Sequence, residues 1–138
     1  LKKHKCKKNI IEDQLLNVPC INIQTFFCLC ILHNISFIFK DSNFFWSYIY
    51  DEKNIYIVKK EKKNIYIYEN ENEKEKEINT IKNKCIQTAS LHKKIKSISN
   101  YKMVDIDIIS KKLHINMYKE NNKKKTKKII YSEILQNI

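Results

Sequence analysis

Hydrophobic positions are concentrated in one segment near the start of the chain. No charged residue occurs at positions 14–39, and residues 20–39 read CINIQTFFCLCILHNISFIF. Twenty residues in a helix extend about 30 Å, which matches the hydrocarbon core of a bilayer. Aromatic residues follow directly after Lys40 and Asp41, as they do where membrane helices meet lipid headgroups. The pattern therefore predicts an apolar helix within residues 14–40 that serves as a membrane anchor.

A buried core helix or a pair of core strands is the alternative for this segment. Four polar residues favour that alternative, since each polar group costs free energy in lipid: Asn22, Gln24, His33 and Asn34. If the segment spans a bilayer, the basic leader at residues 1–13 stays cytoplasmic, because positive charge is enriched on that side. Residues 41–138 would then follow the secretory route to the lumen or the outside. A chain without the anchor would be cytoplasmic.

A hexapeptide repeat follows the aromatic residues. The sequence KNIYIV at positions 53–58 recurs as KNIYIY at positions 63–68. Both units are rich in β-branched and aromatic residues, so both predict strands. The four residues between them, KKEK, suit a type I turn, and the repeat predicts a β-hairpin over residues 53–69. Two strands alone are marginal in water, so the hairpin needs a third strand or a packed helix.

Helical periodicity returns in the second half of the chain. Residues 69–77, ENENEKEKE, predict a solvated linker or the exposed start of a helix. Apolar residues then recur three and four positions apart, which predicts an amphipathic helix over residues 78–98. Isoleucines four positions apart predict a C-terminal helix over residues 127–138: Ile130, Ile134 and Ile138.

The segments between these helices have other patterns. Val104, Ile106 and Ile108 alternate with two aspartates, which predicts a short half-buried strand, and residues 113–117 predict another. The polar run KENNKKKTKK at residues 119–128 predicts a mobile loop. We therefore expect an α+β or mainly α fold that is partly disordered. Its three regions are a basic leader at 1–13, an apolar segment at 14–40 and a small basic tail at 41–138.

The chain contains no glycine. Glycine takes positive φ without strain and lets a backbone approach a ligand closely. A phosphate loop, a dinucleotide fingerprint and a nucleophile elbow all require it, so the composition argues against these classes of enzyme. Helices also lose their preferred C′ residue, and Asn100 and Asn121 are the residues we expect in its place.

Arginine is absent as well, and all 27 basic residues are lysine. Lys, Asn, Ile, Phe and Tyr together account for 82 of 138 residues, and all five are read from A/T-rich codons. This composition resembles that of malaria-parasite proteins, with their lysine and asparagine runs. The resemblance implies a type of genome and no particular activity. The chain begins at Leu1, which predicts a fragment or a processed product.

The net charge of +12 points to an anionic partner, such as RNA or anionic lipid. A solvated charged face is the simpler alternative, since A/T-rich codons deliver lysine in any case. Without arginine, bidentate readout of guanine is lost, which counts against specific recognition. Four tyrosines could stack on bases: Tyr66, Tyr68, Tyr101 and Tyr118. The lysines that we expect at an anionic surface are Lys82, Lys93, Lys94, Lys96, Lys123, Lys124, Lys125, Lys127 and Lys128.

Three residue groups could carry chemistry, and each has a weak pattern. Cys28-x-Cys30-x-x-His33 gives soft ligands at a spacing that is too short for a zinc site. Asp105 and Asp107 form a D-x-D pair that is common by chance. Cys85 and His92 lie seven apart, on one face of the predicted helix, but too far apart for a nucleophile and its base. We therefore expect no catalytic residue, no cofactor, no metal and no small-molecule substrate.

These patterns support three hypotheses of function. The first is a small non-enzymatic protein, anchored in a membrane or on the secretory route, with a basic tail. The second is a soluble lysine-rich protein that binds RNA or the ribosome. The third is a translated non-coding A/T-rich sequence without a selected function. The oligomeric state follows from none of the patterns.

Overall fold

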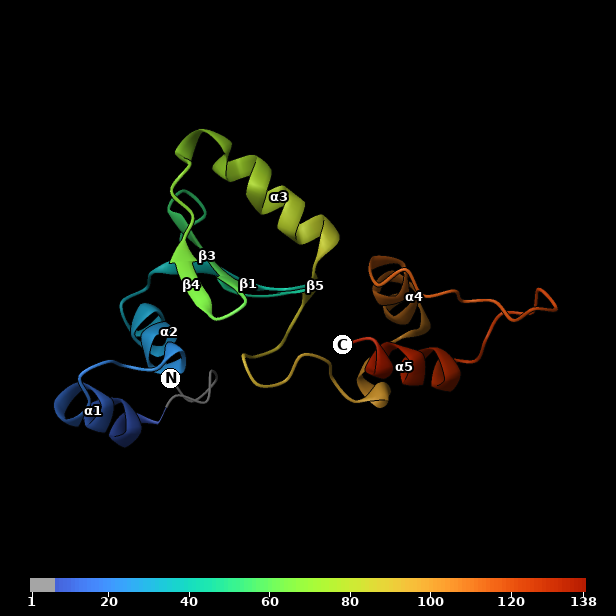
Figure 1. Ribbon diagram of the computed structural model, residues 1–138, viewed down its shortest axis with the longest axis horizontal. Coiled ribbons are helices and arrows are strands. Elements are labelled where there is room, and N and C mark those ends of the chain that lie inside the picture. Colours follow the sequence, from blue (N-terminus) through green and yellow to red (C-terminus); the bar gives the residue numbers. More distant parts are fainter. Residues whose placement is uncertain (1–6) are drawn as a thin grey trace.

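The computed structural model describes residues 7–138, which form a sheet unit (residues 7–88) and a C-terminal lobe (residues 89–138) (Figure 1). The described residues contain five α-helices and a five-stranded mixed sheet, so the expected α+β class is confirmed. The sheet unit contains α1 (Lys8–Asn17), α2 (Ile23–Leu32), β1 (Ser36–Asp41), β2 (Phe44–Tyr48), β3 (Ile55–Glu61), β4 (Asn64–Ile67), η2 (Glu71–Glu73), α3 (Lys74–Lys84) and β5 (Ile86–Gln87). The C-terminal lobe contains η3 (Ile98–Asn100), α4 (Met103–Lys112) and α5 (Lys127–Gln136).

The sheet has the strand order β4-β3-β1-β2-β5, with β1 at its centre. β1 pairs antiparallel with β2 and parallel with β3, while β5 runs parallel to β2 at one edge. One face packs against α2, where Phe27 lies 4.4 Å from Phe37 and 5.5 Å from Trp46 between ring centroids. The other face packs against α3, where Ile38 and Ile81 share a cluster. Because the centre of β1 is buried on both faces, its residues Phe37, Ile38 and Phe39 form a continuous apolar run.

The predicted membrane anchor is wrong, because residues 20–39 divide into two elements. Asn22 caps α2 through a hydrogen bond from the Thr25 N–H, 2.8 Å long. α2 ends after ten residues at Leu32, and Asn34, at the C′ position, has φ 55°. The Ile35 N–H donates to the Cys30 carbonyl at 2.8 Å, which completes a Schellman motif, and β1 begins at once. Among the described residues no helix has both the length and the apolar content needed to cross a membrane.

The predicted hairpin is confirmed as β3 and β4, with a tighter loop than the sequence indicated. Glu61 pairs with Asn64, so the loop holds two residues and the KKEK segment belongs mostly to β3. The first loop residue, Lys62, has φ 56°, and Ser42 has the same φ in the β1–β2 hairpin. Type II′ turns take glycine there, which this chain replaces with lysine and serine. The third strand that the hairpin needs is β1.

The amphipathic helix predicted over residues 78–98 is largely wrong. α3 starts earlier, inside the ENENEKEKE segment, and ends at Lys84. The chain then extends along the sheet edge, where the Ile86 N–H donates to the Asn43 carbonyl and the Thr88 N–H to the Phe45 carbonyl, both at 2.8 Å. Edge pairing therefore replaces the helix, and residues 88–97 form an irregular linker.

The strand predicted at residues 104–108 is a helix, α4. Ile106 and Ile109 are buried three positions apart, and the Asp105 carboxylate accepts the Lys102 N–H at 2.7 Å in the first turn. α4 ends at Lys112, and His114, at the C′ position, has φ 56°. The Ile115 N–H donates to the Ser110 carbonyl at 2.9 Å. The C′ residues are therefore Asn34 after α2 and His114 after α4. Asn100 and Asn121, which the sequence predicts at such positions, do not follow an α-helix. Regular elements continue to residue 136, against the expected disorder.

In the C-terminal lobe, α4 and α5 pack against each other through Ile106, Ile109, Ile130 and Ile134. α5 spans Lys127–Gln136, within the range where a helix is predicted. Phe44 and Ile86 from the sheet unit belong to the same cluster. Lys112 adds a second connection, since its Nζ donates to the Cys85 carbonyl at 2.7 Å and to the Lys82 carbonyl at 3.0 Å, at the end of α3.

The basic leader predicted at residues 1–13 is described only in part. Residues 1–6 lie outside the described residues, and Lys8 begins α1. Lys8 forms an exposed ion pair with Glu12, 3.5 Å long, one helical turn along. α1 packs loosely, because Ile11 is its one buried residue while Leu15 and Leu16 are exposed.

Candidate nucleic-acid interface

The two parts of the molecule differ in their carboxylates and not in their lysines. Residues 7–88 carry twelve lysines and eleven Asp or Glu residues, for a formal charge of +1. Residues 89–138 carry twelve lysines and four Asp or Glu residues, for a formal charge of +8. The two parts thus carry the same number of lysines, but the C-terminal lobe holds them on a shorter stretch of chain and with fewer carboxylates. The excess positive charge therefore belongs to the C-terminal lobe.

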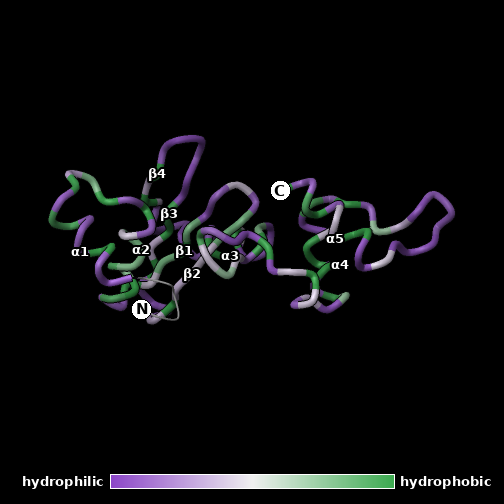
Figure 2. Tube along the Cα trace, turned by 90° about the horizontal axis from the view of Figure 1, so that it is seen from below, coloured by the Kyte–Doolittle hydropathy of each residue, from purple (hydrophilic) through white to green (hydrophobic). Residues whose placement is uncertain are grey.

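A basic arm, residues 116–125, projects from this lobe as a largely hydrophilic extension of the chain (Figure 2). Tyr118 pairs with Lys124 in an antiparallel bridge, and the Lys119 N–H donates to the Lys123 carbonyl at 2.9 Å. Asn122 closes the turn with φ 60°, and its N–H donates to the Lys119 carbonyl at 3.0 Å. The arm is therefore a hydrogen-bonded turn, where the sequence predicts a mobile loop.

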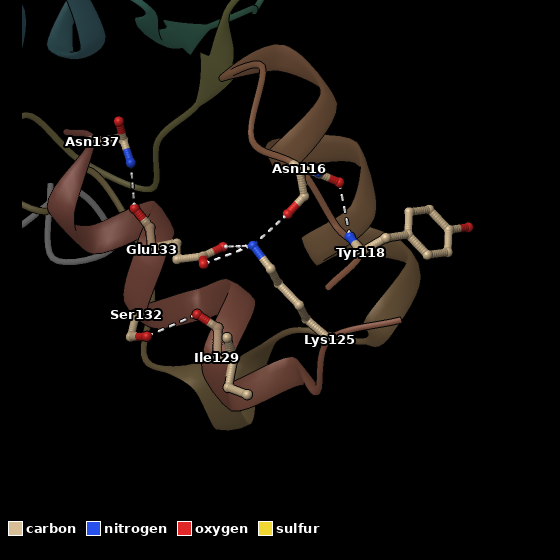
Figure 3. Close-up of polar contacts among 7 residues, drawn as sticks. All are labelled: Asn116, Tyr118, Lys125, Ile129, Ser132, Glu133 and Asn137. Atoms are coloured by element: carbon tan, nitrogen blue, oxygen red, sulfur yellow. Dashed lines mark hydrogen bonds and ion pairs between the residues drawn. The ribbon is translucent and has the colours of Figure 1, made fainter. Parts of the chain in front are cut away.

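Two lysines of the arm are held by carboxylates of the same lobe. Lys125 Nζ lies 2.8 and 2.9 Å from the two carboxylate oxygens of Glu133 on α5, and it donates to the Asn116 carbonyl at 2.8 Å (Figure 3). Lys124 Nζ lies 2.6 Å from Asp107 Oδ2 on α4. These two contacts fix the base of the arm to both helices, so we assign Lys124 and Lys125 to positioning the arm.

Four other lysines of this region have no ion pair with a described residue: Lys119, Lys123, Lys127 and Lys128. Lys127 and Lys128 lie in the first turn of α5, where no acidic residue offsets them. The positive end of the helix dipole makes that position unfavourable for a cation, by about 0.3–1 kcal/mol each. The same arrangement strengthens the field that attracts an anion.

The remaining predicted lysines lie elsewhere. Lys93, Lys94 and Lys96 are exposed on the linker, and the Tyr131 hydroxyl of α5 donates to the Lys96 carbonyl at 2.8 Å. That bond places the linker lysines beside the helix that follows the basic arm. Lys82 lies on α3 instead, around a depression that it shares with Glu71 and Glu75. Lys82 is therefore separated from the other predicted lysines and has acidic neighbours.

The four candidate stacking tyrosines have different surroundings. Tyr118 is 50% exposed on the basic arm. Tyr66 is exposed on β4, which belongs to the sheet unit and not to the lobe. The ring of Tyr68 is covered by Lys59, whose Nζ lies 4.5 Å from the ring centroid. The Tyr101 hydroxyl accepts the Lys96 N–H at 3.0 Å. Only Tyr118 combines an exposed ring with the lobe's unpaired lysines among these four.

The structure does not bring the other candidate groups together. Cys28 is disulfide-bonded, while Cys30 and Cys85 are free thiols whose pKa values are raised chiefly by burial. His92 Nε2 contacts Gln24 Oε1 at 2.9 Å, away from Cys85. Asp105 and Asp107 hold different partners, Lys102 and Lys124. The described residues contain no cluster of three His, Cys, Asp or Glu side chains suited to a metal ion.

No family model, curated protein or solved structure matches this chain. Its function must therefore be inferred from its own charge, shape and contacts. Sequence reasoning omitted Lys119 from the expected surface, although this residue stands at the turn of the basic arm beside Tyr118. The scarcity of carboxylates among the lysines of residues 89–138 is the signal in the sequence that locates the basic region.

Proposed function

We propose that this protein is a non-enzymatic module that binds single-stranded RNA through the C-terminal lobe. The observation that carries this proposal is the segregation of charge, with +8 on 50 residues and +1 on the preceding 82. Phosphate contacts by lysine supply affinity without sequence information, and a chain without arginine lacks the usual bidentate readout. The proposed binding is therefore insensitive to sequence at the lysines themselves.

The basic arm favours a nucleic-acid strand over a lipid surface. Its unpaired lysines follow a narrow projection that is braced on two helices through Lys124 and Lys125. Tyr118 adds an exposed ring at the same place, and bases stack on such rings in proteins that bind single strands. A braced cationic projection with one stacking ring suits a flexible polyanion that can wrap around it.

Salt dependence of RNA binding tests the proposal. The full chain is titrated against a labelled single-stranded RNA of about 20 nucleotides, at several salt concentrations. If Lys119, Lys123, Lys127 and Lys128 each neutralise one phosphate, changing all four to Gln makes the slope of log K against log salt shallower by about 3. Binding that is independent of salt would contradict the proposal.

A matched control removes the same charge from the sheet unit. Lys53, Lys63, Lys76 and Lys84 are exposed there, and changing them to Gln lowers the net charge equally. We expect this control to shift the slope by less than about 1. Equal losses in both variants would show that net charge alone drives binding. Binding to phosphatidylserine vesicles without RNA binding would replace RNA with an anionic lipid surface.

A further inference from the structure

A cavity of about 190 Å³ lies where the sheet meets the linker. Phe39 and Trp46 come from the sheet face that α2 covers, and Leu91 comes from the linker. The polar residues Asp41, Ser90 and Lys94 also line the cavity. The site is thus an aromatic hollow with charged groups, adjoining the first lysines of the C-terminal lobe.

Its size limits the occupant to one ring system. A cavity of about 150 Å³ holds benzene, while pockets for drug-sized ligands measure about 300–1,000 Å³. A volume of 190 Å³ therefore suits a single planar ring or two fused rings. Sugar and phosphate groups attached to that ring would remain outside, in water or on the charged residues.

The linker wall of this cavity is held in place by hydrogen bonds. Thr88 donates twice to the Phe45 carbonyl, through its N–H at 2.8 Å and its hydroxyl at 3.3 Å. The Ser90 hydroxyl accepts the Lys93 N–H at 3.2 Å, and His92 contacts Gln24 on α2 at 2.9 Å. A wall fixed on both the sheet and α2 is preorganised, which lowers the entropy lost on binding.

Lys94 supplies a cation at this cavity. Its Nζ lies 5.0 Å from the centroid of the Phe44 ring, and it forms no ion pair with a described residue. Lys93 and Lys96 lie beside it on the linker, whose Lys96 contacts α5. A phosphate attached to the occupant would therefore contact Lys94, and the backbone of a longer strand would extend from there across the other lysines of the lobe.

Asp41 supplies an acceptor. Its Oδ2 lies 3.4 Å from Lys60 Nζ, and its Oδ1 accepts the Ser42 hydroxyl at 3.3 Å. The side chain is 33% exposed, so lone pairs on both oxygens remain for a ligand. A carboxylate accepts from the amino groups of guanine, adenine and cytosine. Uracil has no amino group, and carbonyl oxygens flank its one free imino N–H, so a carboxylate disfavours it.

We propose that this cavity holds one unpaired, amino-bearing base of the bound RNA, with the adjacent phosphate on Lys94. This inference rests on the proposed function and adds a base subsite to it. The lysine surface carries the strand, and the cavity captures one base from it.

Trp46 is the only tryptophan, so its fluorescence reports occupancy of the cavity. GMP is titrated into the full chain, with ribose 5-phosphate and UMP as controls and N-acetyltryptophanamide to correct for absorbed light. We expect a saturable change with GMP, none with ribose 5-phosphate, and weaker binding of UMP. A response that is absent with GMP, or equal with ribose 5-phosphate, would overturn the inference.

Two variants separate the charged groups. Lys94→Gln is expected to weaken GMP binding about fivefold while leaving guanosine unchanged, since one exposed charge pair is removed. Asp41→Asn is expected to reduce the preference of GMP over UMP, and a thermal melt checks that each variant folds. Equal loss of GMP and guanosine in Lys94→Gln would overturn the phosphate contact.

The same chain distinguishes failure of this inference from failure of the proposed function. Salt-dependent RNA binding without a Trp46 response removes the base subsite and leaves the lysine surface in place. A saturable GMP response without salt-dependent RNA binding removes RNA as the partner and overturns this inference together with the proposed function.

Discussion

The sheet unit and the C-terminal lobe carry equal numbers of lysines that face different partners. In the sheet unit, Lys59 lies 2.6 Å from Glu77, and Lys60 and Lys74 also pair with carboxylates. In the lobe, Lys124 and Lys125 use two of the four available carboxylates. The number of lysines is the same in the two regions and does not locate the basic surface. The number of carboxylates available to pair with them differs, and this difference does locate it.

The two regions also differ in how their cores are built. The sheet unit has a layered core in which α2 and α3 cover opposite faces of the sheet. The lobe has a small helical core that is completed by two residues of the sheet unit, Phe44 and Ile86. The lobe therefore borrows part of its core, and its stability is expected to depend on the sheet unit.

The largest expected effect is Phe27→Ala in the sheet unit. Phe27 is fully buried among four aromatic rings, and its removal should lower the free energy of unfolding by about 3–5 kcal/mol. Urea unfolding followed by Trp46 fluorescence and by circular dichroism measures the change. Leu16→Ala is the control, since Leu16 is 82% exposed and should change stability by under about 0.5 kcal/mol. A loss below about 1 kcal/mol for Phe27→Ala would contradict the packed core.

The next effect separates positioning lysines from contact lysines within the basic arm. Lys125→Met removes the bonds to Glu133 and Asn116 and should destabilise the lobe by about 1–2 kcal/mol. Lys123→Met has no such partner, so it should leave stability unchanged and make the salt dependence of RNA binding shallower by about 0.7. Urea unfolding and RNA titration are measured on both variants. Identical behaviour of the two lysines would contradict the distinction.

A smaller effect concerns the positions that replace glycine in both regions. His114 lies at the C′ position after α4, and Lys62 is the first loop residue of the β3–β4 hairpin; both have φ 56°. Changing either to Gly relieves left-handed strain and should raise stability by roughly 0.5–1 kcal/mol, after the entropy that glycine adds to the unfolded chain. Asn122→Gly is the control, since asparagine tolerates positive φ and should gain less. Thermal unfolding ranks the three, and destabilisation by His114→Gly would refute the assignment.

The smallest effect is a pH dependence confined to the sheet unit. The Lys53 N–H and then the Asn54 amide hold the pKa of Asp51 below its ordinary value of 3.8. A lowered folded pKa favours the charged form, so this contribution is present above pH 3.8 and is lost as pH falls through the folded value. NMR titration of the Asp51 carboxyl measures it, and Asp51→Asn should remove that part of the acid sensitivity. A midpoint above 3.8 would contradict the hydrogen bonds.

The local pattern of apolar residues predicts secondary structure well where neighbouring segments pair with each other. The repeat at residues 53–68 predicts its hairpin because β-branched and aromatic residues favour strands in either partner. The local pattern was a poor guide at residues 104–108, since VDIDI alternates over five positions while the burial of Ile106 and Ile109 follows a helical period. Five residues are too few to distinguish the period of a strand from that of a helix. Packing of Ile106 and Ile109 with residues of α5 favours the helix here.

The candidate site was predictable in composition and unpredictable in detail. The sequence predicts the lysine-rich segments, but it groups Lys124 and Lys125 with the contact residues, whereas they pair with Asp107 and Glu133. Glu133 follows Lys125 by eight positions, across the boundary between the arm and α5, and no periodic pattern connects them. The cavity at Trp46 had no signal, because its walls come from strands and a linker that are distant in sequence.

Local features follow directly from the amino-acid sequence: the surplus of lysine, the paired strands of the repeat, and the capping of α2 by Asn22. The division of the apolar segment at residues 20–39 into α2 and the central strand β1, which pack together, and the set of lysines that keep an unpaired charge depend on the tertiary fold. The reason is physical. Capping and strand preference act between neighbours in the chain, whereas burial and ion pairing depend on which distant segment lies opposite.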